Sequence, residues 1–215
     1  AAPPGVGGPV LRQHEGETVP TPVMLKAKTL TVYDAAEADQ GAAADERHFY
    51  AIDNSAIGKY LLTDGSAVAQ WSDLPSPGIK HLNSCYIEAA QLWCANSNYP
   101  AAPMGSSIEV FDTKTMEHHA THSLGMMEEG SLTWFAATEG GFLASFAHYD
   151  QRGVPYKDHR YSSVVIFDKQ WRRTGGWLFP KVITDLMAPY AASGGAIGPD
   201  GRLYISGHDR PEIYV

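Results

Sequence analysis

Residues 194–209, GGAIGPDGRLYISGHD, have the pattern of a β-hairpin, because two runs of small and apolar residues flank the dipeptide Asp200-Gly201. A turn-forming pair between apolar runs is the strongest short-range hairpin signal in a sequence. The pattern occurs three more times, in GAAADERHFYAIDNS (41–55), SCYIEAAQLWCANSN (84–98) and TWFAATEGGFLASFAH (133–148). Four copies of one unit indicate a repeat architecture.

More strands are predicted after each hairpin. A third strand is expected at 60–64, 108–112, 164–168 and 213–215, and a fourth at 67–71, 117–123 and 173–179. The second strands start at Phe49, Leu92, Phe142 and Leu203, which are 43, 50 and 61 residues apart. The shortest step fits a propeller blade of about 40–45 residues. The predicted fold class is therefore all-β, a β-propeller of four-stranded antiparallel blades with four blades recognisable.

The domain organisation follows from these repeats. A Pro- and Gly-rich lead-in is expected at 1–22 and the propeller at 23–215, with a short helix at 182–187. The repeats lie near 41–74, 80–124, 130–180 and 190–215. The last repeat has three strands, and a propeller must close its ring to avoid open edges. Residues 28–34 read as a spare outer strand that could complete it; the alternative is that more chain follows Val215.

Composition limits the partners and the compartment. The chain is 44% apolar and 19% charged, which is ordinary for a folded protein, and its formal net charge is −8 without a run of Lys or Arg. Nucleic acid and anionic membranes need a positive surface, so neither is expected as a partner. No apolar window is long enough for a membrane span. The unstructured composition of the first 21 residues is typical of the end left by signal cleavage and favours export to the periplasm or the medium.

The two cysteines, Cys85 and Cys94, flank a predicted hairpin centred on Ala89-Ala90. In that register the cysteines face each other directly across the two strands. Opposed Cβ atoms lie about 4.5–5.5 Å apart, slightly wide for a disulfide unless the pair is a non-hydrogen-bonded one. A disulfide and two buried thiols are both compatible with this pattern.

The candidate site comes from the loops that propellers gather at one end of the axis. Function on such folds is carried by these loops and not by the blades. Equivalent loops of four repeats carry His, Asp, Asn and Tyr, and we expect them to form one pocket for a small polar ligand. The catalytic candidates are His148, Asp150, His208 and Asp209, and the ligand-binding candidates are His81, Asn83, Ser84, Asn96, Asn98, Tyr99 and Trp134. His148 and His208 are each followed closely by a carboxylate and could act as general bases.

Some of the polar residues of the chain also have a purely structural interpretation. Asp and Asn in loops often cap turns, and Asp64, Asp112 and Asp168 are predicted to do only that. A divalent metal could bind in the same loops, since His and Asp suit zinc or iron, but the sequence does not indicate which residues would be its ligands. The run 117–122, EHHATH, is expected to be a solvated outer edge strand. Phosphate-loop, nucleophile-elbow and zinc-protease motifs are absent from the sequence.

Several blocks resemble a known group of proteins. HLNS (81–84), ANSNYP (95–100), GSLTW (130–134), GGWLFP (175–180) and 193–215 resemble bacterial exported β-propellers that commonly carry the label "cycloisomerase", within the lactonase and NHL-like propellers. The resemblance implies a propeller fold. It supplies no catalytic residues, and in that group the chain runs on through roughly another blade, which favours a five-bladed parent.

The predicted function is therefore an exported propeller that binds a small polar ligand, sugar- or lactone-like, at the mouth of the central channel. Hydrolase, lyase or isomerase turnover of that ligand is left open. The alternative function is a non-catalytic scaffold whose propeller face docks a protein or a glycan.

Overall fold

The computed structural model describes residues 23–73 and 78–215, and the chain divides into two compact units, 1–32 and 33–215. The described residues of the first unit, 23–32, form no helix or strand, and their large apolar side chains are exposed. Residues 28–34 belong to no strand, contrary to the prediction of a spare outer strand. The predicted lead-in, 1–22, lies outside the described residues.

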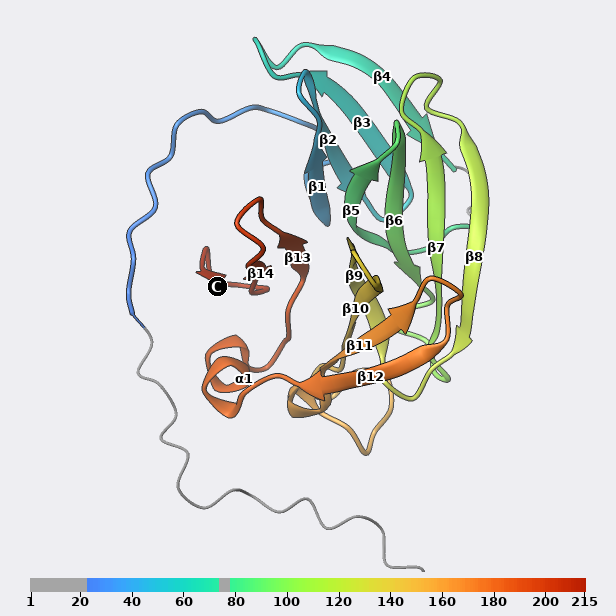
Figure 1. Ribbon diagram of the computed structural model, residues 1–215, viewed down its shortest axis with the longest axis vertical. Helices are drawn as coiled ribbons and strands as arrows, with labels where there is room; N and C mark the ends of the chain where they lie inside the picture. Colours follow the sequence, from blue (N-terminus) through green and yellow to red (C-terminus); the bar gives the residue numbers. More distant parts are fainter. Residues whose placement is uncertain (1–22, 74–77) are drawn as a thin grey trace, which may run out of the picture. The chain divides into compact units, whose positions relative to one another are not determined.

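The described residues of the second unit form four antiparallel sheets, the blades of the propeller, in which strands pair in chain order (Figure 1). Blade 1 contains β1 (Gly41–Ala44), β2 (His48–Asp53), β3 (Ala56–Leu61) and β4 (Ala67–Ser72). Blade 2 contains β5 (Leu82–Glu88), β6 (Gln91–Ser97), β7 (Gly105–Asp112) and β8 (His118–Met126). Blade 3 contains β9 (Ser131–Thr138), β10 (Gly141–Ala147), β11 (Ser163–Asp168) and β12 (Arg173–Leu178). Blade 4 contains β13 (Gly194–Ile197), β14 (Leu203–Ser206) and β15 (Ile213–Tyr214).

The predicted fold class is confirmed: the protein is an all-β, four-bladed propeller. The four predicted second strands lie in four different sheets, as β2, β6, β10 and β14. The predicted helix is present as α1 (Lys181–Met187), and a 3-10 helix, η1 (His159–Tyr161), precedes β11. The third strand of blade 1 starts earlier than predicted, at Ala56, because Asn54 and Ser55 form the turn after β2. No helix among the described residues is long and apolar enough to cross a membrane.

The innermost strands pack against one another along the axis. β1 lies beside β5, β5 beside β9, and β9 beside β13, and β13 also reaches β5. Glycines permit this approach, because a Cβ added at Gly41 would lie 2.9 Å from the backbone oxygen of Asn83. A Cβ at Gly195 would lie 2.4 Å from the indole ring of Trp134. Small residues on the inner strands are therefore a condition for the blades to come together.

The hydrophobic core lies between successive blades. Tyr50 and Ile52 of blade 1 form one cluster with Leu82 and Leu92 of blade 2. Further clusters join blade 2 to blade 3, around Phe135, and blade 3 to blade 4. Burial of these apolar side chains, at about 25 cal/mol per Å², holds each blade to its neighbour.

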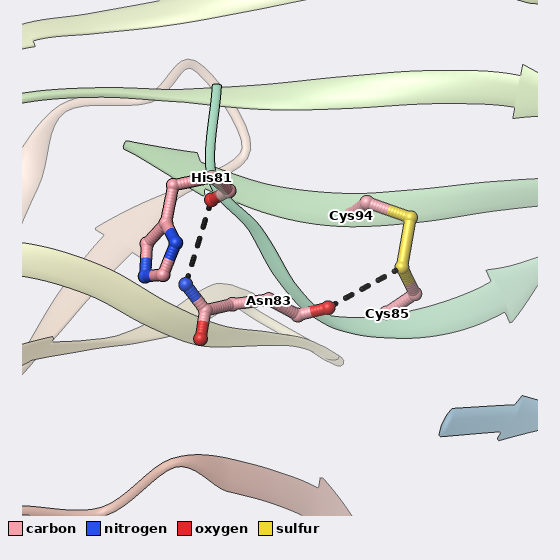
Figure 2. The surroundings of a disulfide bond; sticks show 4 residues. All are labelled: His81, Asn83, Cys85 and Cys94. Carbon is pink, nitrogen blue, oxygen red and sulfur yellow. Dashed lines mark hydrogen bonds between the residues drawn. A yellow bond between two sulfur atoms is a disulfide. The ribbon is translucent and has the colours of Figure 1, made fainter. Parts of the chain in front are cut away.

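The hairpin of β5 and β6 carries a disulfide bond between Cys85 and Cys94 (Figure 2). The two residues are directly opposed in the register, and their Cα atoms lie 4.0 Å apart. Ala89 and Ala90 both have positive φ, the backbone of a type I′ turn that matches strand twist. The predicted register is therefore confirmed, and the cysteines are bridged.

Three aspartates at or just after the ends of third strands act in turns, as predicted. Asp64 accepts a hydrogen bond from the backbone N–H of Ser66 (2.9 Å), Asp112 from that of Thr115 (2.8 Å), and Asp168 from that of Arg172 (2.9 Å). Each carboxylate closes the connection to the outer strand of its blade.

Replacing Gly195 by Ala should destabilise the propeller, since the new Cβ would collide with the buried ring of Trp134. Overpacking of this kind costs about 1–3 kcal/mol in the free energy of unfolding. Gly140→Ala is the control, because nothing lies within 4 Å of its added Cβ. Urea melts of both variants measure the difference. Equal stabilities would contradict the close packing of β13 on β9.

Candidate functional site

A cluster of aromatic rings lies where the loops of blades 2, 3 and 4 meet. The ring of Tyr99 stacks on His81 at 5.0 Å and meets Tyr149 edge-on at 5.4 Å. Tyr149 in turn contacts Tyr190 (5.5 Å) and His208 (5.7 Å), which stack on each other at 4.1 Å. The structure therefore brings His81, Tyr99 and His208 into one group, the aromatic cluster, through two tyrosines that the sequence analysis did not select.

Polar groups border the aromatic cluster. His208 Nδ1 lies 2.6 Å from Asp209 Oδ1, and the side chains of both residues are exposed, at 39% and 60%. Arg152 donates a hydrogen bond to the hydroxyl of Tyr99 (3.2 Å). His81 Nδ1 lies 2.5 Å from Asn54 Oδ1. The predicted residues Asp209 and His208 are thus accessible at the loop end of the propeller.

Three predicted ligand residues lie at the axis, out of reach of solvent. Asn83 and Ser84 in β5 are 4% and 9% exposed, and Asn83 Nδ2 donates to the backbone oxygen of His81 (3.5 Å; Figure 2). Trp134 is completely buried between blades 3 and 4. The interpretation of Trp134 as a channel-facing residue is therefore wrong, because the close approach of β13 covers its ring.

The two predicted catalytic residues of blade 3 flank Tyr149 in the chain, but their side chains bond to groups outside the aromatic cluster. His148 is 1% exposed, and its Nε2 lies 3.2 Å from the backbone oxygen of Glu128. It was predicted as a general base at the channel mouth, and the structure places it among buried residues instead. Asp150 Oδ1 accepts hydrogen bonds from the backbone N–H (3.1 Å) and Nδ1 (2.7 Å) of His159.

Asp150, Asp158 and His159 have ligand atoms within 4.8 Å of one another, close enough to surround a cation. Asp158, however, caps η1 and is paired with the guanidinium of Arg160, which lowers the pKa of Asp158 to about 2. Its charge is thus already balanced inside the protein. The hydrogen bonds of these residues hold the loop between β10 and β11 in place.

The remaining predicted residues, Asn96 and Asn98, line a groove between blades 1 and 2. This groove has a volume of about 740 Å³. Trp71 and Ile79 contribute to one wall, and the opposite wall is the face of blade 2 formed by β6, β7 and β8. Asn98 holds the loop between β6 and β7 at the edge of the groove. Its Oδ1 accepts a hydrogen bond from the N–H of Gly105 (2.9 Å), and its Nδ2 donates one to the backbone oxygen of Pro103 (3.0 Å).

A buried carboxylate forms the floor of the groove. Glu109, in β7, is 2% exposed, and four side chains donate hydrogen bonds to it. The donors are Ser107 Oγ (2.5 Å) and Asn96 Nδ2 (3.4 Å) on Oε1, and Thr121 Oγ1 (2.5 Å) and His118 Nε2 (2.8 Å) on Oε2. A buried charge with this number of charge-assisted hydrogen bonds is satisfied and rigid. Asn96 also accepts from the backbone N–H of His81, which connects the groove to the aromatic cluster.

Sequence reasoning missed Glu109, although a signal was present. In IEVF (108–111) a single acidic residue, Glu109, interrupts an apolar strand, where an unpaired charge would be too costly to bury. β8 is the outer strand of its blade, as predicted. His118 is exposed, as predicted, and its Nε2 also reaches Glu109. His122 stacks between Trp93 (5.5 Å) and Trp171 (5.4 Å).

Comparison with known proteins assigns neither a family nor a function to the chain. No family model matches the sequence, and no curated protein matches it. Similar solved structures include hydrazine synthase of Kuenenia stuttgartiensis (13% identity, TM-score 0.47) and the GH43 endo-arabinanase of Bacillus licheniformis (12%, 0.49). Another is the extracellular domain of a one-component system of B. thetaiotaomicron (7%, 0.40). The matches cover 79%, 80% and 78% of this chain and 44%, 66% and 26% of those chains. Similarities of this size carry no argument about activity.

Stability should decrease as the pH falls from about 7 to 5. Burial lowers the pKa of His81 and of His148 below the ordinary value of 6.5. The unfolded chain therefore binds more protons than the folded chain below that pH, and protonation favours unfolding. Urea melts between pH 7.5 and 5 measure the slope, which should be smaller in His81→Gln. An unchanged slope in that variant would contradict the assignment to His81.

Proposed function

We propose that this protein is an exported propeller that binds a neutral, polyhydroxylated small molecule, such as a sugar or a sugar lactone, in the groove between blades 1 and 2. The observation that carries this proposal is the groove itself, which has a floor of fixed polar groups beneath an aromatic wall. Its volume of about 740 Å³ falls within the roughly 300–1,000 Å³ typical of small-molecule sites. The proposal moves the binding position from the predicted channel mouth to the neighbouring blade interface.

The chemistry of the groove suits a ligand with one apolar and one hydrogen-bonding face. Trp71 offers a ring, held in place by an edge-on contact with Phe111 at 4.6 Å. The opposite wall offers hydroxyl groups, an imidazole and an amide from β6, β7 and β8. Aromatic faces combined with a few well-placed polar groups fix the orientation of such ligands.

Glu109 fixes the orientation of the polar side chains that line the groove. Its carboxylate holds Ser107, Thr121 and His118 in single orientations, so little side-chain freedom remains to be lost when a ligand binds. Because a carboxylate cannot donate, we infer that His118 uses Nε2–H for this hydrogen bond, which leaves Nδ1 for a ligand. A ligand hydroxyl is the natural donor to that atom.

The same pair is suited to proton transfer. A buried carboxylate that orients an imidazole is the arrangement of many general bases, and the side chain of His118 is 33% exposed while that of Glu109 is 3% exposed. Hydrolysis, elimination or isomerisation of a bound lactone would each need a base in this position. The proposal therefore includes catalytic turnover of the ligand with His118 as the base. Binding of the ligand can be tested separately from turnover.

Export is proposed from the disulfide. The bond between Cys85 and Cys94 includes both cysteines of the chain. Disulfides persist in oxidising compartments and are rare in the cytosol, so the periplasm or the medium is the expected location.

Substitution of His118 by Gln should weaken ligand binding at least tenfold, since Gln can still donate to Glu109 but presents no imidazole to the groove. His119→Gln is the matched control, because His119 lies next to it on β8 and does not line the groove. Isothermal titration with a panel of neutral monosaccharides and aldonolactones measures both variants. Urea melts show whether either change alters stability.

Two results would contradict the proposal. One is binding that is equally strong in the wild type and in His118→Gln. The other is the absence of binding across the panel, which would favour a scaffold that docks a macromolecule.

A further inference from the structure

A second, smaller cavity lies between the loops of blades 2 and 3 and has a volume of about 60 Å³. Its lining residues are Pro103, Met104, Met126, Met127, Glu128, His148 and Val154. Three of the six methionines of the chain therefore surround one small space. This cavity shares one lining residue, Met126, with the groove, and nothing in the proposed function depends on it.

The imidazole of His148 has one nitrogen without a partner. Nε2 lies 3.2 Å from the backbone oxygen of Glu128, and because a carbonyl can only accept, Nε2 carries the hydrogen. Nδ1 is then the bare nitrogen, and it is buried without a hydrogen-bond partner among the described residues. Burial lowers the pKa of His148, so the ring is neutral near pH 7. A buried, bare imidazole nitrogen is costly to leave unpaired and is available to a metal.

The hydrogen bond on the other nitrogen is also what metal-binding histidines use. A ligating His commonly donates its second N–H to a backbone carbonyl, which fixes the tautomer and the orientation of the ring. In this protein the carbonyl of Glu128 has that role, and the side chain of Lys157 donates to the same oxygen. The hydrogen bond that orients the His148 ring for metal binding is thus already present in the fold.

The other donors available in the cavity are thioether sulfurs. Met104 is 4% exposed, and its backbone oxygen accepts from the N–H of Met127 (3.0 Å), which holds the two residues side by side. The Glu128 carboxylate is directed to Lys157 (3.3 Å) and Tyr156 (3.1 Å). Nitrogen and thioether donors without free carboxylates disfavour hard cations such as Ca²⁺ and Mg²⁺, and thioethers select Cu(I).

We propose that His148, Met104 and Met127, with Met126 at the solvent side, form a binding site for Cu(I). Met126, which is 75% exposed, is the lining residue at the solvent side of the cavity. Water is a poorer occupant, because an ordered water needs two to four polar partners and thioethers are only weak acceptors.

Anaerobic titration of the full chain with Cu(I), in competition with bicinchoninate, tests the proposal. We expect one bound ion per chain, and X-ray absorption spectra of the copper should show both sulfur and nitrogen ligands. Met104→Leu and Met127→Leu remove the sulfur at nearly constant volume, so the fold should tolerate them. Each should weaken Cu(I) binding at least tenfold. Met187→Leu is the matched control, since Met187 is similarly buried (6% exposed) in α1 and outside the cavity.

Three outcomes would overturn the proposal. If the protein fails to compete with bicinchoninate for Cu(I), the site is not formed. Binding that is unchanged in both Met104→Leu and Met127→Leu means that copper sits elsewhere. A spectrum with nitrogen ligands alone assigns the ion to exposed histidines such as His119.

Discussion

The contact of inner strands along the axis is the constraint on which the rest of this propeller depends. β1, β5, β9 and β13 approach so closely that side chains larger than hydrogen cannot be accommodated at Gly41 or Gly195. That approach places the apolar faces of consecutive blades within reach of each other, and the core clusters form there. The disulfide between Cys85 and Cys94 fixes the hairpin at the centre of the first of these clusters.

Close packing at the axis also decides where ligands can bind. Asn83, Ser84 and Trp134 lie on the inner strands and are covered by neighbouring strands, so the axis offers no position for a small molecule next to them. Between blades 1 and 2 the apolar cluster gives way to the network around Glu109, and the groove lies above it. The aromatic cluster covers the loop end and is linked to this network through Asn96.

The sequence predicted the local structure well because the decisive interactions are local. Turn-forming residues and alternating apolar residues specify a hairpin within about 15 residues, and the register of Cys85 and Cys94 followed from the position of Ala89-Ala90. Asp112 and Asp168 bond to N–H groups two to four residues away, which sequence alone reveals.

The site was predicted only in part, because it depends on contacts between residues far apart in the chain. Equivalent loops do share one end, and His81, Tyr99 and His208 meet through ring contacts. His148 was selected from an equivalent loop and Trp134 from an inner strand, but neighbouring segments bury both side chains. The role of Glu109 required knowing that residues 96, 107, 118 and 121 converge on it, which is a property of strand register across three strands.

The central claim is that the groove between blades 1 and 2, and not the loop end over the axis, holds the ligand. A crystal structure of the protein soaked in a neutral monosaccharide that binds in solution tests this claim most directly. We expect the sugar ring against Trp71, with a hydroxyl within hydrogen-bond distance of His118 Nδ1. A sugar seated on Tyr190 and His208, with solvent alone in the groove, would contradict the account.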